Sequence, residues 1–199
     1  MIRAVFFDFY SVWTPDVFSE HLEEARRLGP AYSDELESIV AEYFSGKITA
    51  ADVAEAFRVK LNRPDIDTNE FTINESDISP AVGDFMRSLH GHFLKLGVLA
   101  NLGAQEYNLL VNFNNHNPLF EVITGPLQMG LSVPLLTQEV FAKALQAIGE
   151  PPRSCLVVSG HPEYLSFAEE LGIAALPFEG MPKLRQTLDQ ILKSEIPGA

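Results

Sequence analysis

Basic residues and cysteines are both scarce in this sequence. Its 199 residues include 14 lysines and arginines against 27 aspartates and glutamates, so the formal net charge at neutral pH is −13. This charge repels phosphate backbones and anionic membrane surfaces, which argues against nucleic acid or a membrane as a partner. The single cysteine, Cys155, begins an apolar run. We interpret it as a reduced thiol of the core, because a lone cysteine excludes a disulfide framework.

Long hydrophobic runs are also missing. No stretch approaches the roughly 20 apolar residues that a membrane-spanning helix requires. The sequence starts directly on a short strand-like run, without the pattern of a targeting segment. We therefore expect a soluble, cytoplasmic protein. A hydrophobic content of 46% is enough for one well-buried core with a small insertion.

Short apolar runs alternate with amphipathic segments over most of the sequence. Runs typical of buried strands lie at residues 4–9, 96–100, 122–124, 156–158 and 174–176. Helical periodicity follows them at residues 80–89, 106–113, 138–148, 163–171 and 182–192. This order predicts an α/β fold, a Rossmann-like parallel sheet covered by helices on both faces. Ligands bind such sheets at the carboxyl ends of the strands.

Residues 15–75 interrupt this alternation. They contain three amphipathic helical patterns with no strand between them, at residues 17–28, 34–44 and 50–61. We predict a small all-helical cap inserted after the first strand and closed by a polar segment at residues 62–79. The α/β core then comprises residues 1–14 and 76–199.

Asp8 ends the apolar run 5–8, and Asn101 ends the run 96–101. Together with residues 130–141 and 157–172, these segments resemble the four motifs of the haloacid dehalogenase (HAD)-like hydrolase superfamily, with a small helical cap after the first strand. The resemblance covers nearly the whole chain. It implies that Asp8 occupies the position of the nucleophile, and that Mg²⁺ would be the cofactor.

The groups that phosphatases of this superfamily need beside the nucleophile are missing. The general-acid position is Tyr10, and the threonine position of the first motif is Val12. The phosphate-binding serine or threonine of the second motif corresponds to Ala100. No lysine or arginine occurs between Lys95 and Lys143, so the lysine of the third motif is absent in every register.

The expected metal ligands have also been replaced. Ser159 and Tyr164 stand where phosphatases keep acidic ligands, and Mg²⁺ prefers carboxylates and other hard oxygen ligands. We therefore expect no metal site and no cofactor. An aspartate that attacks a phosphate dianion needs positive charge nearby, so we also expect ordinary phosphatase activity to be absent.

Haloacid dehalogenases, which use no metal, match this chain in two further places. They resemble it in having tyrosine at the position of Tyr10 and serine at the position of Ser159. In those enzymes an arginine from the cap helps to hold the leaving halide. Arg26 and Arg27 are candidates for that role. The default interpretation is a solvated helix face with Glu23 and Glu24, and we favour it.

The residues expected to line a pocket around Asp8 are Phe9, Tyr10, Asn101, Ser159, Gly160 and His161. Asp8 is either a working nucleophile or a remnant held by backbone donors, and we favour the remnant. We expect the hydroxyl of Tyr10 to bond to Asp8 while its ring forms a wall. His161 is either a base in the cleft or a surface turn histidine, and we favour the surface turn.

Three functions fit these observations. The first is a HAD-like protein with a degenerate site, a pseudoenzyme that binds a ligand or has a regulatory role. The second is an active hydrolase of the same fold, dehalogenase-like or a phosphatase, with Asp8 as nucleophile. The third is a protein-interaction module, with a homodimer as one form. A small molecule is the partner expected for the first two.

Overall fold

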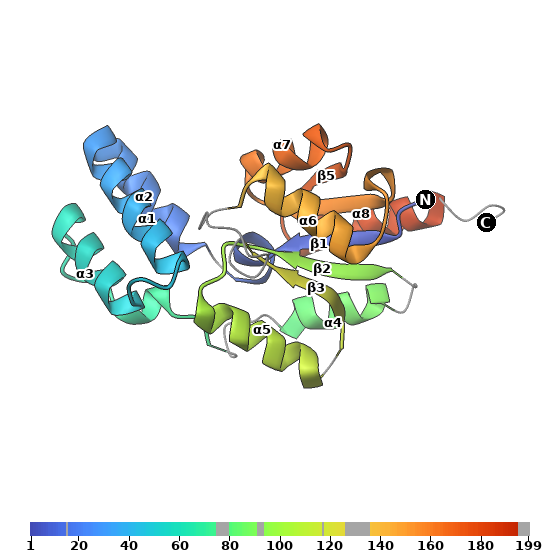
Figure 1. Cartoon of the computed structure of the whole chain (residues 1–199), viewed down its shortest axis with the longest axis horizontal. Coiled ribbons are helices and arrows are strands. Elements are labelled where there is room, and N and C mark those ends of the chain that lie inside the picture. The colour runs from blue at the N-terminus through green and yellow to red at the C-terminus, as the bar shows by residue number, and fades with distance from the viewer. Residues whose placement is uncertain (15, 75–79, 91–93, 117, 126–135, 195–199) are drawn as a thin grey trace.

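Five parallel strands form one sheet at the centre of the protein (Figure 1). The computed structural model describes residues 1–14, 16–74, 80–90, 94–116, 118–125 and 136–194. The strands are β1 (Ala4–Asp8), β2 (Lys95–Leu99), β3 (Phe120–Thr124), β4 (Cys155–Ser159) and β5 (Ala174–Pro177), in the order β3-β2-β1-β4-β5. Strand β1 is therefore central, and all five of its residues are buried.

Helices cover both faces of the sheet. Alternate residues of β1 point to opposite faces, so Val5 and Phe7 join one hydrophobic cluster while Ala4 and Phe6 join another. The first cluster includes residues of α4 (Pro80–His90), α5 (Ala104–His116) and α8 (Met181–Ser194). The second includes residues of α6 (Gln138–Ile148) and α7 (Pro162–Glu170). The predicted Rossmann-like fold is thus confirmed.

Three helices stand beside the core, at the end of the sheet where β1 finishes (Figure 1). They are α1 (Val17–Leu28), α2 (Pro30–Phe44) and α3 (Ala50–Leu61), and we call them the cap. Helix α2 starts earlier than its periodicity predicted, because Pro30 fits the first turn of a helix and Gly29 turns the chain with a φ of 134°. The predicted boundaries at residues 15 and 75–79 lie outside the described residues.

Aromatic rings hold the cap together and join it to the turn after β1. The ring of Phe18 lies within 6 Å, centroid to centroid, of the rings of Tyr10, Tyr43, Phe44 and Phe71. Phe71 ends a 3₁₀ turn, Thr68–Phe71, and is buried, as is Ile66. The segment predicted as a polar closure therefore contributes to the core, because its described residues Ile66, Phe71 and Ile73 are buried in the hydrophobic cluster.

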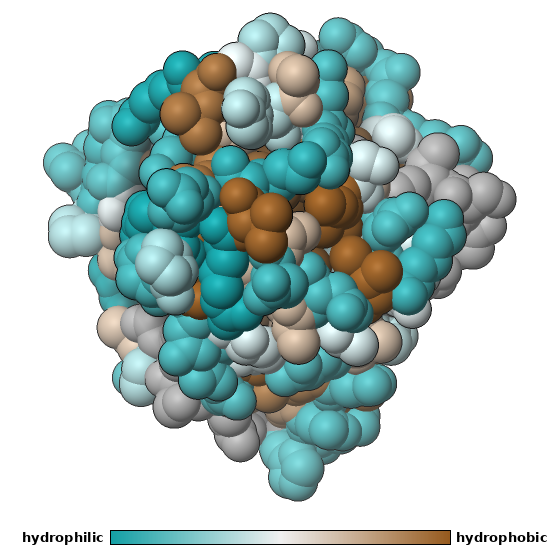
Figure 2. All heavy atoms as spheres, turned by 90° about the vertical axis from the view of Figure 1, so that its left-hand side faces the viewer, coloured by the Kyte–Doolittle hydropathy of each residue, from teal (hydrophilic) through white to brown (hydrophobic). Residues whose placement is uncertain are grey.

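The end of the molecule formed by the cap is mostly hydrophilic, with separate hydrophobic areas (Figure 2). Three of the large hydrophobic residues exposed on the protein belong to cap helices, Leu28, Tyr32 and Val59. In the part of the chain that the structure describes, no helix has the length and hydropathy to cross a membrane.

Candidate active-site cleft

Asp8 lies at the carboxyl end of the central strand, and its side chain is almost completely buried. A single π-helical turn, Phe9–Trp13, follows it and returns the chain toward the strand end. The Asp8 Oδ2 atom accepts hydrogen bonds from the hydroxyls of Ser11 and Ser159, at 2.8 and 2.7 Å. Predicted strand residue Phe9 thus belongs to the turn, which brings Ser11 against the carboxylate.

Each of these hydroxyls also accepts a hydrogen bond from a backbone N–H group of the turn after β4. The N–H of Gly160 donates to Ser11 Oγ at 2.8 Å, and the N–H of His161 donates to Ser159 Oγ at 3.0 Å. The predicted backbone donors therefore hold Asp8 indirectly: they donate to the two serine hydroxyls, which in turn donate to the Asp8 carboxylate. A Cβ at position 160 would lie 2.8 Å from Ser11 Cβ, so glycine permits this close approach.

His161 lies between two carboxylates inside the cleft. Its Nε2 atom is 3.0 Å from Asp16 Oδ2 and 3.5 Å from Asp8 Oδ2. Its side chain is 25% exposed. The predicted surface turn histidine is therefore wrong, because the turn after β4 directs the ring toward the start of α1.

Asp16 is a residue of the cleft that sequence reasoning missed. It caps α1 by accepting hydrogen bonds from the backbone N–H and the hydroxyl of Ser19, at 3.0 and 2.6 Å. An aspartate just before a helical pattern is a recognisable capping signal. That local role gave no indication of the contact with His161, which joins the cap to the core.

The charges of this cluster change one another's pKa. Burial raises the pKa of Asp8, although the charge on His161 and the serine hydroxyls oppose that rise. Burial alone would lower the pKa of His161, but the hydrogen bond to Asp16 and the charge of Asp8 raise it overall. For Asp16, burial is outweighed by the hydrogen bonds from His161 and Ser19, and the pKa falls. The raised pKa of His161 and the lowered pKa of Asp16 both favour a protonated His161 facing an ionised Asp16.

Asn101 and Tyr164 also line the cleft, and the ring of Tyr164 lies 4.9 Å from that of His161. Asn101 Nδ2 donates to the Tyr164 hydroxyl at 2.9 Å, and Asn101 Oδ1 accepts from the N–H of Leu136. Burial raises the pKa of Tyr164 far above its usual value, so it remains an uncharged phenol. Tyr164 therefore provides no acidic ligand at the position where phosphatases keep one.

Tyr10 is buried and serves as a wall. Its ring packs edge-on against Phe9 and Phe18, with centroids 5.2 and 5.8 Å away. Its hydroxyl has no hydrogen-bond partner among the described residues, so the predicted bond to Asp8 is not formed. Burial and the nearby charge of Glu106 raise its pKa well above the usual value, which is unsuited to a general acid at neutral pH.

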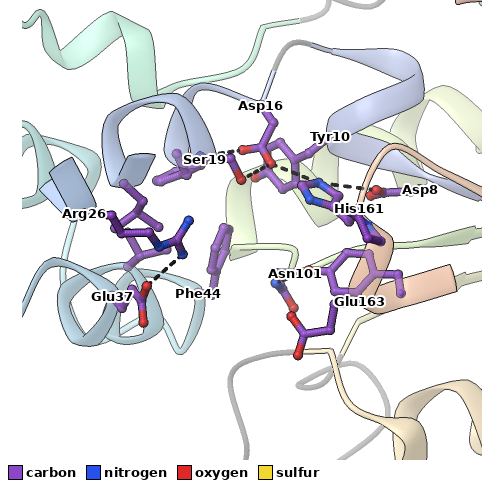
Figure 3. Close-up of a pocket in the computed structure, with 15 residues that line it drawn as sticks. Asp8, Tyr10, Asp16, Ser19, Arg26, Glu37, Phe44, Asn101, His161 and Glu163 are labelled. Carbon is purple, nitrogen blue, oxygen red and sulfur yellow. Dashed lines mark hydrogen bonds and ion pairs between the residues drawn. The ribbon is translucent and has the colours of Figure 1, made fainter. Parts of the chain in front are cut away.

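These side chains enclose a cavity of about 320 Å³ between the cap and the core (Figure 3). The core contributes Asp8, Tyr10, Asn101, His161, Pro162, Glu163 and Tyr164, and the cap contributes Asp16, Phe18, Ser19, Leu22, Arg26, Glu37, Val40 and Phe44. Of the predicted pocket residues, Phe9, Ser159 and Gly160 do not line it. Arg26 also lines it and pairs with Glu37 at 2.7 Å, and its side chain is 55% exposed, as expected for a solvated helix face.

Solved structures with a similar arrangement of strands and helices include HAD-family enzymes and dehalogenases. The chain has the HAD-like fold. A HAD family enzyme from Bacteroides thetaiotaomicron, solved with magnesium and inorganic phosphate, has 16% sequence identity and a TM-score of 0.58 over 92% of this chain and 99% of its own. A HAD-like family hydrolase from Porphyromonas gingivalis has 18% identity and a TM-score of 0.59, covering 94% and 98%.

An L-2-haloacid dehalogenase is similar in the same way, with 20% identity and a TM-score of 0.58 over 94% of this chain and 99% of its own. No family model and no curated protein sequence matches the chain. The similarity is therefore one of fold, and the function has to be argued from the residues of the cleft.

The described part of this HAD-like cleft does not gather a set of ligands for a magnesium ion. Oδ2 of Asp8 is already occupied by two hydroxyls and His161. Within the described ranges, no three histidine, cysteine or acidic side chains gather in a way that would hold a metal. Residues 130–135 of the predicted third motif lie outside the described residues. Cys155 is buried at the start of β4, and burial raises the pKa of its thiol to about 11, which disfavours a reactive thiolate.

His161 is expected to stabilise the protein in a pH-dependent way. Its pKa in the folded state is raised above the ordinary 6.5. Its stabilising effect is therefore complete below about pH 6.5 and is lost as the pH rises through the folded pKa. Urea unfolding of the wild type and His161→Gln across this range should give a stability difference that shrinks with increasing pH.

The matched control is His90→Gln, which changes an exposed histidine at the end of α4. It should leave the pH dependence of stability unchanged. A wild-type advantage that grows as the pH rises would contradict the placement of His161 between two carboxylates.

Proposed function

We propose that this protein binds a small molecule in the cleft between cap and core, and that it does not catalyse ordinary magnesium-dependent phosphate hydrolysis. The proposal rests on the side chains that contact Asp8. Two serine hydroxyls and one histidine contact its carboxylate, and one of these serines, Ser159, stands where the resemblance places an acidic metal ligand of phosphatases.

Electrostatics supports this proposal. A carboxylate approaching a phosphate dianion experiences strong repulsion, which catalytic cations must offset in the transition state. Removing one such stabilising group commonly lowers the rate by about 10² to 10³-fold, and losses of several groups leave little activity. His161 supplies a single positive charge here, and Asp16 already balances it.

Magnesium-dependent phosphatase assays on the wild type and on Asp8→Asn test the catalytic part of the proposal. Both proteins should hydrolyse phosphate esters at the same background rate. Turnover in the wild type that the substitution abolishes would refute the proposal. A thermal-shift screen of small metabolites tests the binding part, because a ligand that binds only the folded state raises the melting temperature. A screen without any stabilising compound would contradict it.

A second candidate, a metal-independent hydrolase, is favoured by one feature of Asp8. All its hydrogen bonds and ion pairs with described residues go to Oδ2. Oδ1 accepts no hydrogen bond from those residues, which is the arrangement that an attacking carboxylate oxygen needs. A halide-release assay with short 2-haloacids on the same two proteins separates this candidate from the first. Halide release that depends on Asp8 would establish the hydrolase.

A further inference from the structure

The cavity between the cap and the core has more negative than positive groups on its wall. Its lining includes the carboxylates of Asp8, Asp16, Glu37 and Glu163, against the cationic side chains of Arg26 and His161. A cavity with an excess of one charge concentrates ligands of the opposite charge. The excess of negative charge therefore disfavours the binding of phosphates and carboxylates, which a HAD-like fold would suggest as ligands.

Both cationic side chains of the lining are already paired. Arg26 Nη2 is 2.7 Å from Glu37 Oε1, and the two groups belong to neighbouring cap helices (Figure 3). His161 faces Asp16 and Asp8. An anion that entered the cavity would have to displace one of these carboxylates to gain a cationic partner from the described lining.

Glu163 differs from the other acidic residues of the lining because no described side chain binds its carboxylate, which can therefore bind a ligand. It lies exposed in the first turn of α7, and it forms no hydrogen bond or ion pair with a described side chain. Figure 3 shows it extending from the core side of the cavity toward the cap. The side chain thus presents to the cleft a carboxylate that accepts no hydrogen bond from a described side chain, although its charge also acts on His161.

The cap side of the cavity includes an apolar and aromatic wall. Phe18, Leu22, Val40 and Phe44 line it, and Phe44 lies between the Arg26–Glu37 pair and Asn101 in Figure 3. Aromatic faces attract cations, and aliphatic side chains accommodate a hydrocarbon portion. The buried hydroxyl of Tyr10, also a lining residue, is a second acceptor without a partner among the described residues.

We propose that the cleft binds a small organic cation, an amine with an apolar portion. Its ammonium group pairs with Glu163, and its apolar portion packs against the wall formed by Phe18, Leu22, Val40 and Phe44. A cavity of about 320 Å³ matches a ligand of this size. The inference rests on the proposed function only in using the cleft as a ligand site.

Calorimetry with two probes of similar shape and opposite charge tests the inference. Phenethylamine and hydrocinnamate share a phenyl ring on a short chain, and inorganic phosphate serves as a third probe. Phenethylamine should bind the wild type at least tenfold more tightly than either anion. Glu163→Gln should weaken its binding about two- to fivefold, the effect of one partly solvated ion pair.

The matched control is Glu169→Gln, which removes the same charge from an exposed residue of α7 that does not line the cavity. It should leave the affinity unchanged. Tighter binding of an anion, no binding of phenethylamine, or equal losses in both variants would overturn the cation inference. None of these results concerns phosphatase turnover or the wider metabolite screen, so the proposed function is judged separately.

Discussion

Replacing Phe18 by alanine is expected to lower the free energy of unfolding by about 3–5 kcal/mol, the cost typical of deleting a buried aromatic ring. Phe18 is 4% exposed, and its ring contacts those of Tyr43, Phe44 and Phe71 within the cap. It also contacts Tyr10, which follows the central strand. Its loss leaves a void where the cap packs on the core, and urea unfolding measures the effect.

Tyr32→Ala is the control for this change. Tyr32 lies on α2 and is 45% exposed, so its truncation should cost about 1 kcal/mol or less. Similar losses for the two variants would show that the Phe18 cluster does not form as described. Binding in the cleft should weaken in Phe18→Ala as well, because the ring forms part of the cavity wall.

Replacing Tyr43 by phenylalanine is expected to lower the free energy of unfolding by about 1–3 kcal/mol at neutral pH, because a buried acceptor loses its partner. The Tyr43 hydroxyl donates to Glu106 Oε1 at 2.6 Å, and Glu106 is completely buried. The other oxygen of this carboxylate, Oε2, has no hydrogen-bond partner in the described structure. The substitution therefore removes the main side-chain partner of a buried acid.

The pH dependence of this loss identifies its cause. Burial raises the pKa of Glu106, and the hydrogen bond from Tyr43 opposes that rise. Without the hydroxyl, the pKa rises further, so the deficit of Tyr43→Phe should shrink as acid protonates Glu106. Tyr32→Phe removes an exposed hydroxyl from the same helix and should have little effect at any pH. A deficit that does not change with pH would argue against the role of Glu106.

Much of the fold could be predicted because local signals agree with it. Helices α1, α3 and α6 have the bounds that their periodicity gave. A capping box at Thr49 begins α3, and Gly149, with a φ of 70°, ends α6. Strand β1 could be predicted as well, because it is apolar up to Asp8 and buried on both faces. The predicted strand ended one residue too late, at Phe9, because the π-helical turn that begins there has no distinct sequence pattern.

The candidate site was harder to predict because its contacts join distant parts of the chain. Asp8 was found from the strand that it ends. The meeting of Asp16 with His161, and of Tyr43 with Glu106, depends on how the cap rests on the core. Each of these residues also satisfies an ordinary local pattern, such as a helix cap or an amphipathic face. Nothing in the sequence marks which distant side chain it will contact.

The ion pair between Asp16 and His161 couples proton uptake to the position of the cap. Asp16 begins the first cap helix, whereas His161 belongs to the core turn after β4. Proton binding at His161 and its contact with Asp16 are therefore thermodynamically linked, and each must favour the other to the same extent. A compound that stabilises this contact between α1 and the core should increase proton binding at His161. A lower pH should, in turn, strengthen the contact until Asp16 itself is protonated.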